Sequence, residues 1–465
     1  MGALKQRGAG AVRALRIAKW VLFLLGCAVA LSPFAVAIAA WRAEARLDEA
    51  VQEIVRRGEP VEASQLVRPP IPDSENAALV YDKAFDAIEL SDEDEELIAD
   101  LKAERVSLEA PGIAARAQTI LDRNAEALES VHRAAGMPRS DFRVDWSKGY
   151  DVGFPHLAKL RTCARLLAFE SLMLLDAGRV DEAADVCGAI FRVANAAEEP
   201  CTIGQLVRYA INGMGSRALS GVLRESQPDS DLCRRLADEI GRTDLASTFK
   251  EALKGERALG RATFAAVRSA KDPLDAIEDL QAGPPAEPSG SSEGGRPERP
   301  PKQSYMARWM LASDEAEYLQ RMARVIEDAP RPYREVQRAL EELGYMKVTY
   351  LPPPTVVTAM LLPAFDRTFA SRDSAIAQLR LAEAALLLKA YKGERGQYPE
   401  SLAELEEFVG RELPADPFSG NSLVYQREGD GFLIYSWGAN LEDDGGSPSP
   451  PERAEEGDMV FRCLR

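Results

Sequence analysis

The residues best suited to chemistry are oxygen-bearing side chains near the C-terminus. They are Asn440, Glu442, Asp443, Asp444 and, after a gap, Asp458. Carboxylate and amide oxygens are hard ligands, and the glycines among them let the backbone curl around a cation. Their spacing is not that of an EF-hand loop. Two interpretations are therefore open: a structural cation site, or a solvated acidic loop that runs into a Ser/Pro-rich stretch.

Other signals of catalysis are weak. The two histidines, His132 and His156, lie in or just before predicted helices, where capping and surface roles are usual. The six cysteines have no CxxC or zinc-like spacing, so buried thiols and one or two disulfides both fit them. No HExxH or P-loop motif is present, and we predict no catalytic and no cofactor-binding residue. Two carboxylates suffice for glycoside hydrolysis, which keeps a carboxylate-dependent hydrolase as an alternative.

An uncharged apolar run, VLFLLGCAVALSPFAVAIAA, occupies residues 21–40. As a helix with about 1.5 Å rise per residue it would cover about 30 Å, the thickness of the hydrocarbon core of a bilayer. Trp20 and Trp41 stand at its two ends, where indole rings favour the headgroup region. We therefore expect a transmembrane helix over residues 21–41 that contacts the lipid bilayer.

The charges around this run predict its orientation. Residues 1–20 hold five basic side chains and no acidic one, so the positive-inside rule places them in the cytoplasm and residues 42–465 outside it. The expected location is the inner (cytoplasmic) membrane, with a single pass and the body in the periplasm or another extracytoplasmic space. The alternative is a signal peptide cleaved after Ala37-Ile38-Ala39, which would also export the body.

The body itself is strongly acidic. The chain has 57 Lys and Arg against 74 Asp and Glu, and without the five basic residues of the tail 52 remain against 74, a net charge of −22. Such a surface repels phosphate backbones. A nucleic-acid partner is therefore not expected.

The apolar pattern predicts a mainly α-helical domain, an irregular bundle or short solenoid, over residues 42–372. The acidic run 91–96 is interpreted as a helix start, because carboxylates suit the positive end of the helix dipole. A helical hairpin that turns at residues 177–181 resembles one tetratricopeptide-type unit, although no second copy follows. Residues 283–302, of which thirteen are Gly, Pro or Ser, are expected to form a flexible insert.

The pattern changes after a long helix predicted from Asp373 to Lys392. Leu423–Arg427 and Phe432–Ser436 alternate like strands around a Gly/Asp turn, and Met459–Leu464 can add a third strand. We therefore predict a small α+β module over residues 373–465.

From about residue 380 onward the chain resembles the globular end of type II secretion major pseudopilins. The matching segments are AEAALLLKAYKGERGQYP (382–399), SLAEL (401–405), LPADPFSGNSLVY (413–425) and YSWGANLEDDGG (435–446). The resemblance implies that the loop after the hairpin binds calcium, here through the five oxygen-bearing residues between 440 and 458. The family's leader cleavage site is missing near Val21. The tail is therefore interpreted as a borrowed fold on a large bacterial single-pass membrane protein, not as part of a pilus.

Together these features predict a non-enzymatic envelope protein that acts through contacts with a protein partner, a role that helical surfaces suit. The alternatives are an exported carboxylate-dependent hydrolase and an accessory component of a secretion or pilus-like system. Calcium is the one cofactor considered.

Overall fold

The structure is a computed structural model that describes residues 20, 32, 34–270, 276–277, 305–342, 355–362, 365–448 and 457–463. The predicted insert over 283–302 and residues 21–31 and 33 of the predicted transmembrane run lie outside these ranges. Among the helices of the described part, none is long and apolar enough to cross a membrane. The chain divides into two compact units, of which unit 1 comprises residues 1–61, 260–323 and 346–362, and unit 2 comprises 62–259, 324–345 and 363–465.

Unit 1 is built from helical segments. They are residues 34–56, the last part of α10 (Leu245–Ser269), most of α12 (Tyr305–Asp328) and α14 (Val356–Leu361). Buried acidic side chains on α12 connect these segments. Asp314 accepts the backbone N–H groups of Val357 at 2.9 Å and Thr358 at 3.2 Å, and so caps α14. Glu315, fully buried, pairs with Arg261 at 3.0 Å.

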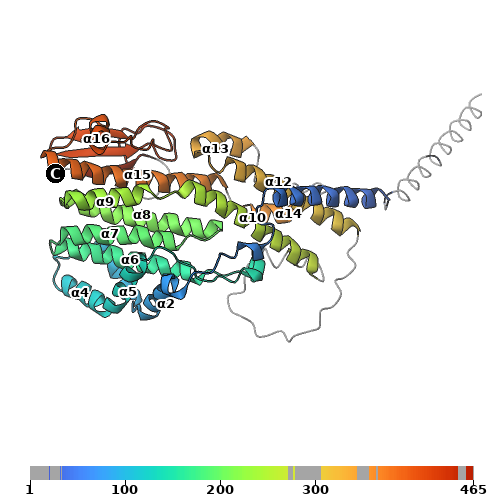
Figure 1. The fold of residues 1–465 in the computed structure, drawn as a ribbon, viewed down its shortest axis with the longest axis horizontal. Helices are drawn as coiled ribbons and strands as arrows, with labels where there is room; N and C mark the ends of the chain where they lie inside the picture. The colour runs from blue at the N-terminus through green and yellow to red at the C-terminus, as the bar shows by residue number, and fades with distance from the viewer. Residues whose placement is uncertain are drawn as a thin grey trace, which may run out of the picture. The chain divides into compact units, whose positions relative to one another are not determined.

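Unit 2 holds most of the described helices, which Figure 1 shows as successive layers from α4 and α5 through α6, α7, α8 and α9 to α15. The helix bounds are α2 (Ala78–Ala87), α3 (Asp92–Lys102), α4 (Ile113–Arg123), α5 (Ala125–Ala135), α6 (Pro155–Asp176), α7 (Val180–Ala196), α8 (Thr202–Glu225), α9 (Ser230–Gly241), α13 (Tyr333–Glu342), α15 (Phe365–Arg395) and α16 (Leu402–Val409), with short 3-10 turns η1 (Ala63–Leu66), η2 (Asp73–Glu75) and η3 (Trp146–Asp151). The prediction of a mainly helical fold is confirmed.

The hairpin predicted at residues 177–181 joins α6 to α7. Pro155 stands at the first position of α6, where its missing N–H costs nothing. Gly178 ends the helix with φ of 71°, a left-handed conformation that glycine adopts without steric cost. The facing sides of the two helices are buried, and Leu167, Cys187 and Ile190 are fully inaccessible to solvent.

A three-stranded antiparallel sheet lies near the C-terminus, with strand order β1-β2-β3. The strands are β1 (Val424–Glu428), β2 (Gly431–Ser436) and β3 (Met459–Cys463), each within one residue of its predicted bounds. The middle strand β2 is buried along its whole length. The predicted small sheet at this end of the chain is therefore confirmed.

One apolar core joins this sheet to the helices before it. The core contains Leu223 of α8, Leu236 of α9, Leu386 of α15, Phe432 of β2 and Cys463 of β3. Helix α15 begins at Phe365, earlier than predicted, so the predicted domain boundary between residues 372 and 373 falls inside this helix.

Candidate functional site

The segment between β2 and β3 coils through several left-handed positions. φ is 77° at Gly438, 62° at Leu441, 67° at Gly445 and 77° at Gly446. Glycine takes such values freely, whereas at Leu441 the conformation costs about 1–2 kcal/mol. A Cβ atom on Gly438 would lie 2.4 Å from the carbonyl oxygen of Gly457. The backbone that enters the loop therefore runs directly against the backbone that leaves it.

Four of the five predicted ligands lie in this coil. The side-chain amide of Asn440 donates to Asp444 Oδ2 at 2.8 Å, and Asp443 Oδ1 accepts from the Tyr435 hydroxyl at 3.0 Å. The side chain of Glu442 is exposed to solvent, as are those of Asp443 and Asp444. The loop thus brings these oxygens onto one short coil without burying them.

The fifth predicted ligand, Asp458, is the buried member of the set, with 2% of its surface exposed. Its Oδ2 atom accepts the N–H of Gly446 at 2.7 Å, while its Oδ1 atom is buried without a hydrogen-bond partner. Burial raises the pKa of Asp458, and the negative charges of Asp444 and Asp443 raise this pKa further. A cation bound here would relieve both effects.

The carboxylates alone do not form a complete site. Within the described ranges, no group of three or more His, Cys, Asp or Glu side chains is arranged to hold a metal ion. Calcium takes six to eight oxygens and accepts backbone carbonyls among them. A site in this loop would therefore depend on backbone carbonyls as well as on Asp458.

Comparison with known proteins adds no relative. The chain matches no protein-family model, no curated protein and no solved structure. The resemblance of the C-terminal part to major pseudopilins stays a prediction.

A second surface feature is a depression of 640 Å³ at one end of the helical layers, here called the acidic groove. It lies where the α6–α7 hairpin turns. Its lining residues are His132, Glu170, Leu174, Arg179, Asp181, Glu182, Asp185, Val186, Asp229, Leu232 and Arg235. Five are carboxylates, two are arginines and one is a histidine. This groove could not be predicted from the sequence, because its residues come from α5, α6, α7 and the start of α9, each of which looks by itself like a solvated helix surface.

Ion pairs hold the groove residues in place. His132 Nε2 lies 2.7 Å from Glu170 Oε2, Arg179 Nε donates to Glu182 at 2.7 Å, and Arg235 pairs with Asp185 at 3.2 Å. The two remaining carboxylates are engaged by backbone N–H groups. Asp229 caps α9, and Asp181 accepts the N–H of Asp229 at 2.8 Å. The two arginines offset only two of the five carboxylates, so the groove carries an excess of negative charge.

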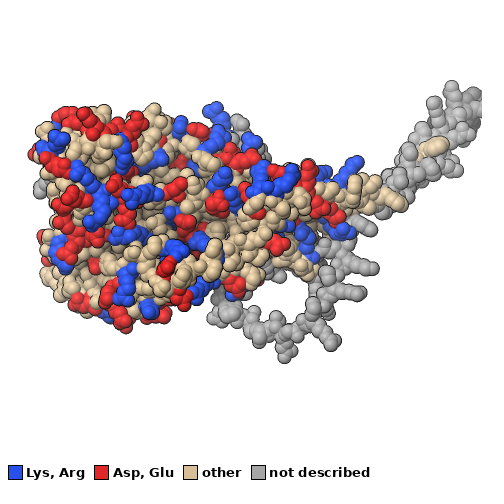
Figure 2. Space-filling view, viewed as in Figure 1, with Lys and Arg blue, Asp and Glu red and all other residues tan. Residues whose placement is uncertain are grey.

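Elsewhere on this surface charges of both signs are mixed. In the face drawn in Figure 2, Asp and Glu side chains alternate with Lys and Arg side chains over the helices. Isolated surface pairs of this kind each contribute little stability. On this face, the charges thus give no broad electrostatic preference for a partner.

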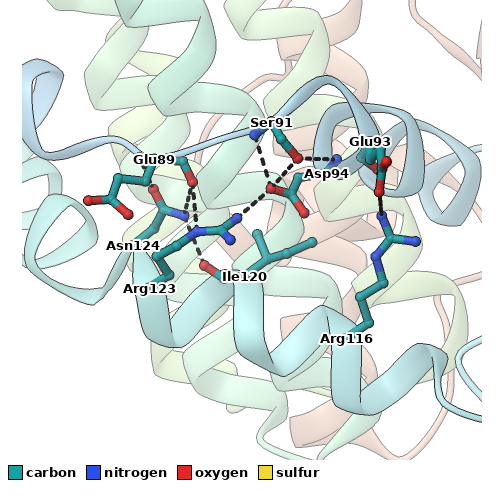
Figure 3. Close-up of polar contacts among 8 residues, drawn as sticks. All are labelled: Glu89, Ser91, Glu93, Asp94, Arg116, Ile120, Arg123 and Asn124. Atoms are coloured by element: carbon teal, nitrogen blue, oxygen red, sulfur yellow. Dashed lines mark hydrogen bonds and ion pairs between the residues drawn. The ribbon is translucent and has the colours of Figure 1, made fainter.

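The acidic run 91–96 is a helix start, as predicted. The Ser91 hydroxyl accepts the N–H of Asp94 at 3.2 Å, and the Asp94 carboxylate accepts the N–H of Ser91 at 3.0 Å, which forms a capping box at the start of α3 (Figure 3). Arg123 also binds Asp94. The hydrogen bonds from Ser91, followed by the Arg123 guanidinium, hold the pKa of Asp94 below its usual range. This carboxylate is therefore used for local structure.

His156, the described cysteines and Trp146 are also buried in the core. His156 is buried, stacks on the Phe142 ring at 4.2 Å between ring centroids and lies 3.1 Å from Glu199. The described cysteines 163, 187, 201, 233 and 463 are buried free thiols, which is one of the two arrangements left open by their spacing. Trp146 packs against Phe154 and is buried.

Ser247 and Lys250 have the Ser-x-x-Lys spacing of some serine acyl-transfer enzymes. Both lie in the first two turns of α10, where the Asp244 carboxylate accepts the N–H of Ser247 at 2.9 Å. The Ser247 side chain is exposed. A nucleophilic serine works beside its base in a site that limits water, so we interpret this spacing as part of a capped helix start.

Proposed function

We propose that this protein is a membrane-anchored protein whose body lies outside the cytoplasm and binds a protein partner. One observation carries the anchor. On the helix over residues 34–56, Phe34 and Trp41 are each 69% exposed and Ile38 is 52% exposed. Large apolar side chains in such a row favour an apolar environment over water. Phe34 and Ile38 belong to the uncharged run over residues 21–40 and Trp41 follows it directly, and lipid is the environment that suits the whole run.

The topology is tested with reporters fused to the C-terminus of the full chain. An alkaline phosphatase fusion is expected to be active, because this enzyme requires export, and a fluorescent protein that matures in the cytoplasm is expected to stay dark. The matched control removes residues 1–41, after which the two reporters should exchange their behaviour. Full activity of the cytoplasmic reporter on the intact chain would overturn the proposal.

The acidic groove is the partner site that we favour. Its lining combines the apolar side chains of Leu174, Val186 and Leu232 with an excess of negative charge. This combination suits a partner segment with an apolar residue flanked by lysine or arginine. The tethered body would present this groove to other envelope proteins.

We expect proximity cross-linking in intact cells to recover a specific partner with the wild-type chain and to lose it when Glu182 and Asp185 are both replaced by lysine. Both side chains are exposed, so the substitutions leave the core intact. The Glu126→Lys variant on the exposed face of α5 is the matched control and should keep the partner. Equal recovery by all three proteins would remove the groove from the proposal.

We also propose that the loop after β2 binds a structural calcium ion through Asp458. At a calcium concentration about 100 times the dissociation constant, binding would stabilise the fold by about 2.7 kcal/mol and raise the melting temperature by about 5 °C. Asp458→Asn should abolish this response, whereas Glu442→Gln, at an exposed position, should reduce it only in part. Chelation should return the wild-type protein to its calcium-free melting temperature.

The calcium-free proteins provide a second readout. Because burial raises the pKa of Asp458, the native state favours the protonated carboxyl. Its contribution to stability is complete below the ordinary aspartate pKa and is lost as pH rises through the raised value. Calcium-free Asp458→Asn should therefore be at least as stable as wild type at pH 7. A calcium response that Asp458→Asn retains would contradict this assignment.

A further inference from the structure

Cys463 lies at the end of β3, inside the core shared by the sheet and the helices, and is fully buried. Its sulfur lies 3.3 Å from the Nζ atom of Lys389 on α15, a side chain with 1% of its surface exposed. Lys389 also donates to the carbonyl oxygen of Ser226 at 2.9 Å, which fixes the position of the amine. The Tyr398 hydroxyl lies 3.7 Å from the same sulfur. A nucleophilic nitrogen and an oxidisable sulfur are thus held in contact by three separate elements.

This environment suits oxidation followed by condensation. A cationic neighbour favours the thiolate, which is the form that reacts with peroxides. Burial also lowers the pKa of Lys389, so its ammonium group gives up a proton more readily than that of a surface lysine. The uncharged amine that results is the nucleophilic form. Cys233 also lies near enough to Lys389 to feel its charge, but the hydrogen-bond contact described for its sulfur is with the Pro228 carbonyl oxygen, and the Cys187 thiol contacts the Ser171 hydroxyl at 3.2 Å.

We propose that Cys463 and Lys389 form a reversible covalent sulfur–nitrogen cross-link under oxidising conditions. Hydrogen peroxide oxidises the thiol to a sulfenic acid and is itself reduced to water. The Lys389 amine then attacks the sulfur, the S–N bond forms, and the sulfenic hydroxyl leaves as a second molecule of water. Two equivalents of an added thiol reverse the reaction, because they restore the thiol and the amine and leave as a disulfide.

The cross-link would join the last strand to the long helix. β3 forms one edge of the sheet, and Cys463 stands at its end, so local opening of this strand gives a small neutral oxidant access to the sulfur. Once formed, the bond removes this opening, because the strand end is then fastened to α15. Oxidation would thus stabilise the C-terminal region instead of damaging it.

The test is peptide mapping of the full chain, solubilised in detergent, after treatment with hydrogen peroxide and alkylation of the remaining thiols. We expect a peptide pair that contains Lys389 and Cys463, with a mass about 2 Da below the sum of the two peptides, and its loss on treatment with dithiothreitol. Cys187 in the same sample is the internal control and should be recovered as a free thiol after denaturation. Lys389→Arg, which keeps the charge but not the amine, should give no cross-link and should instead accumulate sulfinic acid at Cys463.

The wild-type map decides the proposal even if the Lys389 variant folds poorly. Recovery of Cys463 as a free thiol, as a sulfinic acid or in a disulfide, with Lys389 unmodified, would overturn it. A mass about 14 Da above the sum of the peptides would mean that an oxygen atom bridges nitrogen and sulfur, and would overturn the direct bond.

Discussion

Replacing Arg372 by methionine is expected to lower the free energy of unfolding of unit 2 by about 3–5 kcal/mol, because it leaves a buried carboxylate without its partner. Arg372 and Asp373 are each 1% exposed, and the Arg372 Nε atom donates to Asp373 Oδ1 at 2.7 Å. The guanidinium also donates to the carbonyl oxygens of Ala329 and Arg331, while Asp373 Oδ2 accepts the N–H of Tyr333. One ion pair near the start of α15 therefore satisfies backbone groups between the end of α12 and the start of α13.

The measurement is unfolding by urea, followed by tryptophan fluorescence, with Arg367→Met as the matched control. Arg367 lies on the same helix but is exposed, so its replacement should change the free energy of unfolding by less than about 0.5 kcal/mol. Asp373 offers an independent check. Burial raises its pKa, so the cost of its unpaired charge in Arg372→Met should diminish at acidic pH, where the carboxyl is protonated. Similar losses for the two arginine variants would show that the buried pair is not the cause.

Replacing Asp416 by asparagine is expected to lower the free energy of unfolding by about 2–4 kcal/mol. Both carboxylate oxygens accept hydrogen bonds, and the NH2 group of asparagine would turn one of these acceptors into a donor. Asp416 is 1% exposed. Its Oδ1 atom accepts from the Ser436 hydroxyl at 2.5 Å and the Phe418 N–H at 3.2 Å, and its Oδ2 atom accepts from the Ser419 N–H at 3.0 Å. These bonds fasten the Asp-Pro-Phe-Ser-Gly turn to the end of β2.

The matched control is Asp430→Asn, the same change at an exposed turn between β1 and β2. Thermal unfolding of both variants should show a lowered midpoint for the Asp416 variant alone. The turn precedes the acidic loop along the chain, and Trp437 at the start of that loop also donates to Asp416. We therefore expect Asp416→Asn to lose the calcium response as well as stability. An unchanged midpoint of thermal unfolding would contradict the role given to this carboxylate.

Regular elements were the most predictable part of the fold. The strands over Leu423–Arg427 and Phe432–Ser436 were predicted within one residue of their observed bounds, because the Gly/Asp turn between them is explicit. The burial of both faces of β2 was not predicted. The acidic run before α3 was equally clear, since Ser91 and Asp94 form a capping box.

Polar residues inside the protein could not be predicted in the same way. Arg372 and Asp373 look like surface residues in the sequence, and the helix start was predicted too late. Their burial depends on the backbone groups of Ala329, Arg331 and Tyr333, which lie about forty residues earlier in the chain. The same limit applies to the cap of α2. Asp73 and Ser74 are residue types that often cap a helix, yet it is the side-chain oxygen of Asn76 that accepts a hydrogen bond from the N–H of Ala78, at 3.1 Å.

The candidate site was predictable in its composition but not in its detail. The five oxygen-bearing residues of the predicted cation site could be chosen by residue type, whereas the burial of Asp458 depends on where β3 joins the sheet. The acidic groove and the contact between Lys389 and Cys463 combine residues far apart in the chain, which no local pattern reveals.

The shared core has a consequence for the order in which the protein can fold. It joins Ala183 on α7 to Phe461 and Cys463 on β3, which are synthesised much later than α7. The apolar faces of α7, α8, α9 and α15 therefore stay incompletely covered until β3 has been synthesised. During that interval the nascent helices expose apolar surface and depend on protection from aggregation.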